Sequence, residues 1–563
     1  MIRAGRIDSR NVVASNSVVK DKQFPAPIKG WASNASIALD NPGFAEVMEN
    51  FIPTQTGIRV RGGQRLAATV SSLAVTRLIN YNGTTTKKLF AASNNSIFDI
   101  TSVASTSTPP TAAVTGLTST EISYITLSNA GGDFLLAFNG ADLHRTYDGA
   151  TWAANTPAIT FTGQPALTSS SITTASVHNN RIWMVQKNSK TAWYLPLDSI
   201  AGAASDFAVE FRRGGKLLFI ATWSSDSGSG SSDRIAFFSD EGEVSVFSGL
   251  YPGDASWQKF GLYDLPTPLG KYAFDKVGGD LLVATVNGIV PMSEVIAKDP
   301  AALSLSAITR NIEPDWKNEV SFNGTRPWSF QKWTEKNIGF VSIPSPTQLR
   351  TTSAVWGTAV WGQDYWGTSP TVEEPIGQTK CYVVNLLTGS WAKITGWDVR
   401  CMTVFDGKFY FGSSNGKVYI GDESGNDAGK SYECRLAYWP SNFGHVGHKV
   451  YSQCEGVFVN STPISPKFSI SVNNELNWPV APGSPGESAT AVKWDTGAKW
   501  DSGVKWDAKG TKIVTTRKWN SLGRAGRVGA PMLQMTFNTS TTPDIEFTDL
   551  TATFTTGAVV VAA

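Results

Sequence analysis

The sequence predicts an all-β protein: a β-propeller of about seven blades, preceded by an N-terminal arm and followed by a C-terminal β-sandwich-like region. Three observations support this fold. The 563 residues include 52 Gly, 20 Trp and 28 Phe, a composition that favours strands and turns over helices. Pairs of short apolar runs joined by turn residues recur through residues 76–422. The centres of these pairs lie roughly 45–55 residues apart, close to the length of a four-stranded propeller blade.

The bulk properties limit the class of protein. With 41% hydrophobic and 17% charged residues the chain can bury a sizeable core, and its net charge is only +2. Such a charge does not by itself indicate nucleic-acid binding. Residues 1–8 lack the apolar segment of a secretory signal, and no apolar run approaches the ~18 residues that span a membrane. The cysteine spacing matches neither a zinc motif nor a small disulfide scaffold. We expect reduced, mostly buried thiols in a protein made in the cytosol: Cys381, Cys401, Cys434 and Cys454.

Residues 1–75 form the expected N-terminal arm, packed on the main body. Asp40-Asn41-Pro42 has the composition of a helix N-terminus. We therefore expect a short helix over Gly43–Asn50, with Ala45 and Met48 on one face. Gly57–Gly63 is expected to be a strand that leads into a glycine turn.

Residues 76–422 form the expected propeller. Asp406–Asp422 shows the repeating unit most clearly, because Asn415-Gly416 joins two apolar runs and Asn-Gly favours a type I′ hairpin turn. A single hairpin cannot bury its own apolar face, so the units must stack on one another. A closed ring of such units also leaves no long sheet edge exposed. The other expected units are 88–100, 133–152, 181–197, 234–247, 280–290, 337–343 and 381–394.

One unit contains a short turn motif. Thr146–Trp152 resembles a shortened Asp-box, a structural motif of propeller hairpins. We expect the side chain of Asp148 to accept hydrogen bonds from turn amides and Trp152 to pack beneath the turn.

Two insertions interrupt the expected propeller, at 296–335 and 346–378. The first contains Asp299–Ala302, where proline at the first helical position predicts a short helix. The second contains three tryptophans at a period of five, and three more recur later at a period of six. An even period keeps side chains on one face of an extended chain. The second set could therefore present three indoles in a row. The two tryptophan ladders are Trp356, Trp361 and Trp366, and Trp494, Trp500 and Trp506.

Residues 423–563 form the expected C-terminal β region, a sandwich of about seven strands. Five segments in it show the alternating pattern of half-buried strands. They are Cys434–Tyr438, Val450–Val459, Lys467–Val472, Met532–Phe537 and Ile545–Phe554.

Few residues suggest chemistry, and we predict no catalytic, cofactor-binding or metal-binding residue. His445 and His448 have the spacing of helical metal ligands, but neighbouring glycines argue against a helix. Asp422, with Ser424, Asn426 and Glu433, follows part of a calcium-loop pattern that lacks the required glycine; an acidic linker is the alternative. The carboxylates show no pair spaced for glycoside hydrolysis, and no nucleotide fingerprint occurs.

The largest charge asymmetry is a basic run near the C-terminus, interleaved with tryptophans and with glycines that would keep it flexible. It could contact DNA or an acidic partner, or it could be a solvated loop. The candidate residues are Lys499, Lys505, Lys509, Arg517, Lys518, Arg524 and Arg527.

The N-terminal motifs resemble those of a known family. Pro25-x-Pro27-x-x-Gly30-Trp31, Asp40-Asn41-Pro42 and Arg61-Gly62-Gly63 are similar to the start of the tail nozzle proteins of short-tailed bacteriophages, also called tail tubular protein B. The Trp-Gly ladder and Ser306–Pro314 fit the same group.

This resemblance implies a structural virion protein and not an enzyme. It implies a homohexameric ring that sits below the head-tail adaptor under the portal, continues the channel for double-stranded DNA, retains the genome and opens for ejection. Tail fibre or side-tail proteins would attach around it, and contact with the host cell surface is possible. The two tryptophan ladders would then contact partners or neighbouring subunits. The protein would be made in the bacterial host cytoplasm and function in the phage tail, without a small-molecule substrate or a cofactor.

Two other functions remain open from the residues. One is a receptor-binding or glycan-active propeller, with exposed tryptophans as sugar platforms. The other is a monomeric scaffold for cytoplasmic partners.

Overall fold

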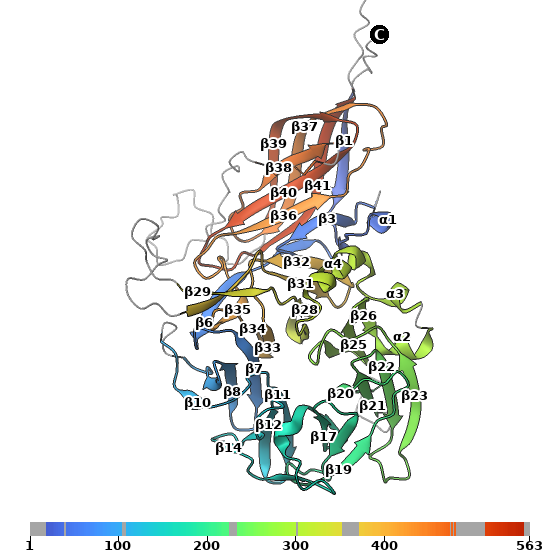
Figure 1. The fold of residues 1–563 in the computed structure, drawn as a ribbon. Helices are drawn as coiled ribbons and strands as arrows, with labels where there is room; N and C mark the ends of the chain where they lie inside the picture. The colour runs from blue at the N-terminus through green and yellow to red at the C-terminus, as the bar shows by residue number, and fades with distance from the viewer. Residues whose placement is uncertain are drawn as a thin grey trace, which may run out of the picture.

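The chain folds into a ring of β-sheets with an elongated β part attached on one side (Figure 1). This computed structural model describes residues 18–38, 41–103, 108–224, 233–299, 302–351, 371–472, 475–476, 478–479 and 513–556. No helix within these ranges is long and apolar enough to cross a membrane. Because the described residues form mainly β-sheets, the fold is all-β, as the sequence predicts, and its larger part is a β-propeller.

Six separate antiparallel sheets form propeller blades. The first two are β7 (Val75–Asn82), β8 (Lys87–Ser93), β9 (Ser96–Asp99), β10 (Ala112–Val114), and β11 (Ser123–Asn129), β12 (Gly132–Phe138), β13 (Arg145–Tyr147), β14 (Trp152–Ala154). The third is β16 (Ile172–His178), β17 (Arg181–Gln186), β18 (Thr191–Tyr194) and β19 (Gly202–Ala208), with β15 (Ile159–Phe161) added in parallel to β19. The fourth and fifth are β20 (Leu217–Ser224), β21 (Asp233–Ser239), β22 (Glu243–Ser248), β23 (Gln258–Asp264), and β24 (Phe274–Val277), β25 (Asp280–Thr285), β26 (Gly288–Pro291). The sixth is β33 (Cys401–Phe405), β34 (Lys408–Gly412), β35 (Lys417–Ser424) and β6 (Gly63–Thr69).

The ring also contains the end of a larger sheet. Strand β27 packs between β24 and β33, and so completes the circle of innermost strands. Its sheet has nine strands and runs out of the ring into the attached part. Six sheets of the ring are separate blades. The expected count of about seven would be reached only if the ring end of this nine-stranded sheet is also counted as a blade, so the higher count stays a prediction. In spatial order the nine strands are β27 (Ser329–Trp333), β28 (Ile338–Ser342), β31 (Lys380–Asn385), β32 (Ser390–Thr395), β2 (Gly30–Trp31), β3 (Phe44–Glu49), β36 (Tyr432–Tyr438), β40 (Gly529–Phe537) and β38 (Lys467–Val472).

The N-terminal segment closes the ring. Strand β6 is the outermost strand of the sixth blade and pairs antiparallel with β35, from Thr69 opposite Lys417 to Gly63 opposite Ser424. The blade that ends the propeller in sequence therefore takes its last strand from residues before the first blade. This pairing covers the edge that β35 would otherwise expose.

The attached part consists of the outer half of the nine-stranded sheet and a second sheet of six strands. Rings from the two sheets contact each other, as between Phe458 and Phe468, whose centroids lie 6.4 Å apart. All five strands expected in 423–563 are present, and N-terminal strands pair with them. The second sheet contains β39 (Ile513–Gly526), β37 (Lys449–Asn460), β41 (Ile545–Thr556), β5 (Ile58–Val60), β4 (Phe51–Pro53), and β1 (Val19–Pro25), which pairs with β41.

The remaining elements are short. Short helices occur in and beside the first insertion; the helix start expected at Asp299–Ala302 includes residues 300–301, which lie outside the described residues, and α3 begins at Leu303. Trp316 of α4 is buried against Trp328. The short elements are α1 (Ala35–Ala38), η1 (Ser169–Ser171), α2 (Met292–Ala297), α3 (Leu303–Ser306), η3 (Arg310–Ile312), α4 (Glu313–Asn323), η4 (Thr334–Lys336), β29 (Thr347–Thr351) and β30 (Thr371–Pro375).

The expected helix over 43–50 is wrong, because Phe44–Glu49 is strand β3. Asn41 instead forms a turn: its side-chain oxygen accepts the amide of Gly43 at 3.2 Å, and its carbonyl accepts that of Phe44. Strand β3 then pairs with β2 and β36, which lie before and far after it in the sequence. These long-range pairings override a local helix signal.

The turn prediction succeeds at one hairpin and fails at another. Asn94 and Asn95 both have positive φ, as a type I′ turn requires. At 415–416 only Gly416 has positive φ, so the expected type I′ turn is wrong there. The connection is a longer loop in which the amide of Ser413 donates to the carbonyl of Lys417.

Two packing predictions are confirmed. Asp148 accepts hydrogen bonds from the amides of Ala150 and Thr151 at 2.9 and 2.7 Å, and Trp152 packs against the rings of Phe90 and Tyr147. All four cysteines are free and buried. Burial raises the pKa of the Cys401 thiol to about 12, so it is protonated at neutral pH.

Candidate functional sites

Both tryptophan ladders lie outside the described residues. So do three of the predicted basic residues, Lys499, Lys505 and Lys509. Their predicted contacts with partners, subunits or DNA stay predictions.

The other basic residues lie on or just after β39, so the expectation of a flexible run is wrong for them. Strand β39 pairs along β37 and forms an edge of the six-stranded sheet among the described residues. Gly523, with φ of +60°, lies near a shift in that pairing, so the glycine bends the strand instead of freeing it.

Strand geometry separates the predicted basic residues. Lys518 is exposed and lies opposite Glu455 of β37, whereas Arg517 is half-buried on the other face of the strand. Arg524 follows the shift in register, and Arg527 lies in the turn after the strand. Trp519 packs against the core. Since side chains alternate along a strand, these cations do not form one continuous basic face.

Asp422 forms ion pairs with protein cations. Its carboxylate lies 2.9 Å from Arg59 Nη2 and 2.6 Å from Lys336 Nζ, and it accepts the amide of Gly62. Burial by itself would raise the pKa of Asp422, but the charges of Arg59 and Lys336 outweigh it and hold this pKa well below its usual range. Within the described ranges no cluster of His, Cys, Asp or Glu is arranged to hold a metal ion. Asp422, the candidate calcium ligand, is thus already paired with two protein cations.

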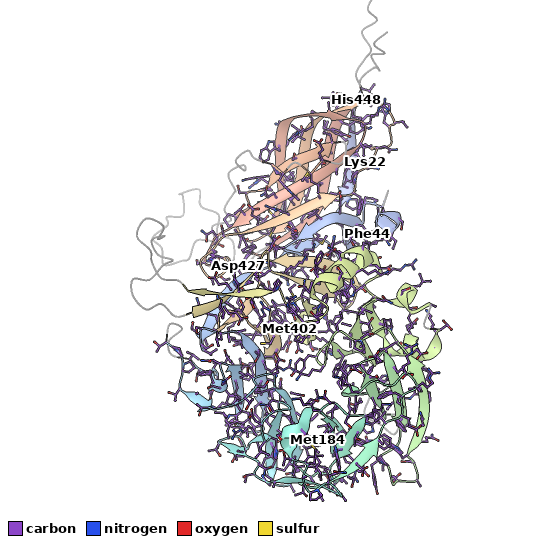
Figure 2. The ribbon with its side chains drawn as sticks, in the orientation of Figure 1. Lys22, Phe44, Met184, Met402, Asp427 and His448 are labelled. Carbon is purple, nitrogen blue, oxygen red and sulfur yellow. The ribbon has the colours of Figure 1, made fainter. Side chains whose placement is uncertain are left out.

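A buried arginine joins the propeller to the attached part. Arg61 is fully buried, and its guanidinium donates to both carboxylate oxygens of Asp427 at 2.9 and 2.7 Å. It also donates to Asn50 Oδ1 at 2.8 Å and lies 4.0 Å from the centre of the Tyr432 ring. Burial alone lowers the pKa of Arg61, but the hydrogen bonds and charge of Asp427 give a net increase. Asp427 marks this junction in Figure 2.

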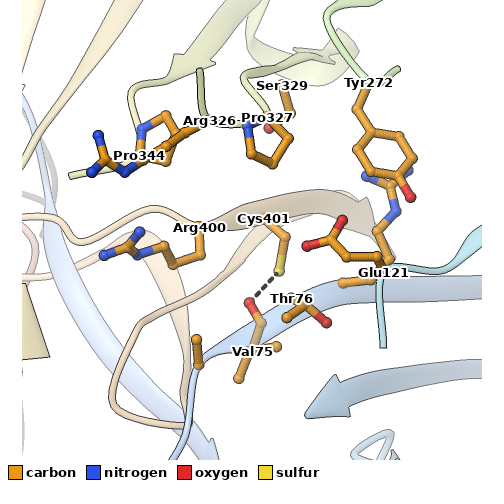
Figure 3. Close-up of a pocket in the computed structure, with 12 residues that line it drawn as sticks. Val75, Thr76, Glu121, Tyr272, Arg326, Pro327, Ser329, Pro344, Arg400 and Cys401 are labelled. Atoms are coloured by element: carbon orange, nitrogen blue, oxygen red, sulfur yellow. Dashed lines mark hydrogen bonds between the residues drawn. The ribbon is translucent and has the colours of Figure 1, made fainter. Parts of the chain in front are cut away.

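Two adjoining cavities are lined by residues in or next to the innermost strands of the ring, and we call them the axial cavities. They have volumes of about 150 Å³ and about 210 Å³ and share Arg77, Tyr272 and Ser329 in their walls. Met402 of β33 lines the larger one and faces the centre of the ring in Figure 2. Figure 3 shows the smaller one, with Glu121 and Tyr272 on one side of the view.

The carboxylates at the axis bear on the glycan-active alternative. Glu121 lines the smaller cavity and Asp275 lines the larger one. Asp275 accepts the amide of Lys332 at 2.7 Å, and burial raises the pKa of its carboxyl group. Neither cavity is lined by both carboxylates, whereas glycoside hydrolysis needs two flanking one bond.

His144 and His445 have partners within the protein. His144 is buried, and its Nδ1 lies 2.8 Å from Ser169 Oγ; burial lowers the pKa of its imidazole. His445 Nδ1 accepts the amide of Gly447 at 3.1 Å. His448 lies at the far end of the attached part in Figure 2.

No protein-family model matches the chain, and no curated protein matches it. Similar solved structures include the β-propeller domain of Myceliophteria thermophila Cps50 (Swd1), which is 11% identical with a TM-score of 0.36 over 64% of this chain and 99% of that one. Chaetomium thermophilum Raptor is 9% identical with a TM-score of 0.38, over 64% of this chain and 29% of that one. A glycoside hydrolase family 43 arabinoxylan arabinofuranohydrolase from Bacillus subtilis, in complex with cellotetraose, is 10% identical with a TM-score of 0.26, over 86% of this chain and 98% of that one. At these scores the likeness adds nothing to what the strand pairing shows.

Proposed function

We propose that this protein is a structural, non-enzymatic component of the tail nozzle of a short-tailed bacteriophage. In this proposal six copies form a ring below the head-tail adaptor, in the virion tail. The ring continues the channel for double-stranded DNA, retains the genome until ejection, and carries tail fibre or side-tail proteins. The resemblance of the N-terminal motifs to the nozzle family is the sequence basis for this proposal.

The observation that supports it best is the continuity of sheet between the two parts of the molecule. The nine-stranded sheet begins at β27 in the ring and ends at β38 in the attached part. Strands β1, β3 and β5 pair with C-terminal strands, while β6 belongs to the ring. Such a chain resists hinge motion between its parts, as a wall subunit around pressurised DNA must. In this proposal the ring end of the nine-stranded sheet is the seventh blade, and the two contacting sheets form the C-terminal sandwich.

The charge of the chain is compatible with a conduit. A lumen lined by many cations would hold DNA through counterion release and impede its passage. The chain as a whole is near neutral, with a net charge of +2. The tryptophan ladders would then be contacts between subunits or with the adaptor and fibres, because aromatic residues carry much of the energy of interfaces.

The oligomeric state tests the proposal. Native mass spectrometry and negative-stain imaging of the purified chain with its adaptor should show a six-membered ring. Replacing Trp500 and Trp506 by Ala should reduce the ring fraction, since interface aromatics often contribute about 2 kcal/mol or more each. Trp257→Phe is the matched control, because this aromatic contact belongs to the propeller wall, stacked on Trp183. A chain that stays monomeric with its adaptor would contradict the proposal.

The alternative, a glycan-active or receptor-binding propeller, has a separate readout. Hydrolysis of a bacterial surface polysaccharide, lost in both Glu121→Gln and Asp275→Asn, would establish it in place of the nozzle. The presence of two carboxylates at the ring axis is the observation that keeps this second function open.

A further inference from the structure

The axial cavities carry an excess of cations. Among the described residues in their walls, Arg77, Arg326, Arg400 and Lys271 are basic, whereas Glu121 and Asp275 are acidic. Figure 3 places Arg326 and Arg400 on the side of the smaller cavity opposite Tyr272. A cavity walled by protein focuses such a charge excess, because the surrounding dielectric is low.

Arg77 is the one cation that lines both cavities among the described residues, and its guanidinium stacks on aromatic rings. Its guanidinium carbon lies 3.9 Å from the centre of the Tyr272 ring and 5.6 Å from that of Tyr124. Its Nε is buried and has no hydrogen-bond acceptor among the described protein atoms. Stacking fixes the plane of a guanidinium but leaves its N–H donors free for an acceptor in that plane.

Further donors around the cavities lack an acceptor as well. The hydroxyl of Tyr272 and the Nη2 of Arg400 are buried without a protein hydrogen bond in the described part of the chain. Arg400 Nε lies 3.3 Å from Asp398 Oδ1, which offsets part of its charge. Burying such groups unsatisfied is costly, so unmatched donors that share one cavity indicate a site for an acceptor.

Lys271 points to the same kind of ligand. Its Nζ donates to the backbone carbonyl of Glu121 at 3.1 Å. Burial lowers the pKa of its ammonium group; the charge of Glu121 opposes this effect in part, and the charge of Arg77 adds to it. A negative ligand nearby would relieve both effects by stabilising the charged forms.

We propose that the smaller axial cavity binds a small oxyanion, of the phosphate class, through the guanidinium of Arg77 and the hydroxyl of Tyr272. Guanidinium groups bind phosphate and carboxylate oxygens through paired, charge-assisted hydrogen bonds. Cavities of about 150 Å³ hold ligands as large as benzene, so phosphate fits the smaller cavity. Glu121, on the same wall, opposes anion binding and sets a limit on affinity. This inference does not depend on the nozzle proposal.

Isothermal titration of the full chain with inorganic phosphate tests the site. Ionic strength is held constant with sodium chloride, so that general screening does not contribute. We expect saturable binding near neutral pH and a phosphate-dependent rise in the unfolding temperature. Arg77→Leu should weaken phosphate binding at least about tenfold, because it removes a charge-assisted donor pair. Tyr272→Phe should weaken it less, since it removes one neutral donor and keeps the ring.

The charge of Glu121 gives a test of opposite sign. Glu121→Gln should tighten phosphate binding, because it removes a like charge from the wall. Arg65→Leu is the matched control: this arginine pairs with Glu423 on the surface, outside both cavities, and its loss should leave binding unchanged. If Arg77→Leu does not fold, Tyr272→Phe and Glu121→Gln still decide the matter. Absence of saturable binding, equal binding by all variants, or weaker binding by Glu121→Gln would overturn the proposal.

Discussion

Two arginines in this molecule, Arg61 and Arg77, both stack on tyrosine rings but differ in their hydrogen bonds. Arg61 lies 4.0 Å from the centre of the Tyr432 ring, and Arg77 lies 3.9 Å from that of Tyr272. Arg61 donates to Asp427, Asn50 and two backbone carbonyls. Arg77 has an unmatched Nε and a place in the walls of two cavities.

The difference teaches that stacking alone does not define the role of a buried cation. At the junction the acceptors come from the protein, so Arg61 holds two parts of the chain together. At the ring axis the acceptors must come from elsewhere, so Arg77 is available to a ligand. Substitutions at the two positions should therefore have very different effects on stability.

The largest effect is expected at the junction. Arg61→Met leaves the buried carboxylate of Asp427 without its bidentate partner, and breaking a buried ion pair in this way costs about 3–5 kcal/mol. Urea denaturation followed by tryptophan fluorescence measures the change. Arg65→Met is the control, because its pair with Glu423 is exposed and such pairs contribute about 0–1 kcal/mol. Equal midpoints for the two variants would show that the junction network is not a principal source of stability.

An intermediate effect is expected at Asp422, beside the junction. Asp422→Asn keeps one acceptor oxygen but loses the charge that faces Arg59 and Lys336, at a cost of about 1.5–3 kcal/mol near neutral pH. The folded pKa of Asp422 lies below the value of about 3.9 in unfolded chains. Its stabilisation is therefore complete above that value and is lost as the pH falls toward the folded pKa.

Thermal unfolding between pH 6 and pH 2 checks this sign. The unfolding temperature of the natural chain should fall more steeply below about pH 4 than that of Asp422→Asn. Parallel curves for the two chains would remove Asp422 from the acid response.

The smallest effect is expected at the ring axis. Without phosphate, Arg77→Leu should change the free energy of unfolding by less than about 1 kcal/mol. Loss of the stacked cation costs roughly what is regained by removing an unmatched buried donor. Urea denaturation in phosphate-free buffer provides the measurement. A loss as large as that of Arg61→Met would mean that Arg77 is a structural cation with partners of its own.

The sequence predicts the propeller well because its signals are local. Asn94-Asn95 between two apolar runs specifies a tight turn through backbone conformation, and Asp148 specifies another through bonds to neighbouring amides. The five C-terminal strands were also predictable, since alternation of apolar and polar residues reflects burial of one face. Such information is contained in a few consecutive residues.

The sequence predicts poorly what depends on distant partners. The segment expected as a helix over Gly43–Asn50 is strand β3 because it pairs with β36. This partner lies almost 400 residues later, so the local sequence does not reveal it. Arg517, Lys518 and Arg524 of the basic run lie in β39 because β37 offers this segment an edge to pair with. The roles of Arg61 and Arg77 were equally hidden: both are arginines near glycine or β-branched residues, and only the fold shows which one meets a carboxylate.

The closure of the ring by β6 has a consequence for synthesis. Arg65 of β6 and Glu423 of β35 are 358 positions apart, so β6 emerges from the ribosome long before its partner strand and must wait for nearly the whole propeller. At about 5–20 residues per second that delay is roughly 20–70 s. During it the nascent chain carries an open circle with unpaired β6, and such strand edges invite aggregation. The rate of translation thus limits how soon the ring can close. A chain that terminates before Lys417 lacks strand β35, so β6 has no strand with which to pair and the ring stays open.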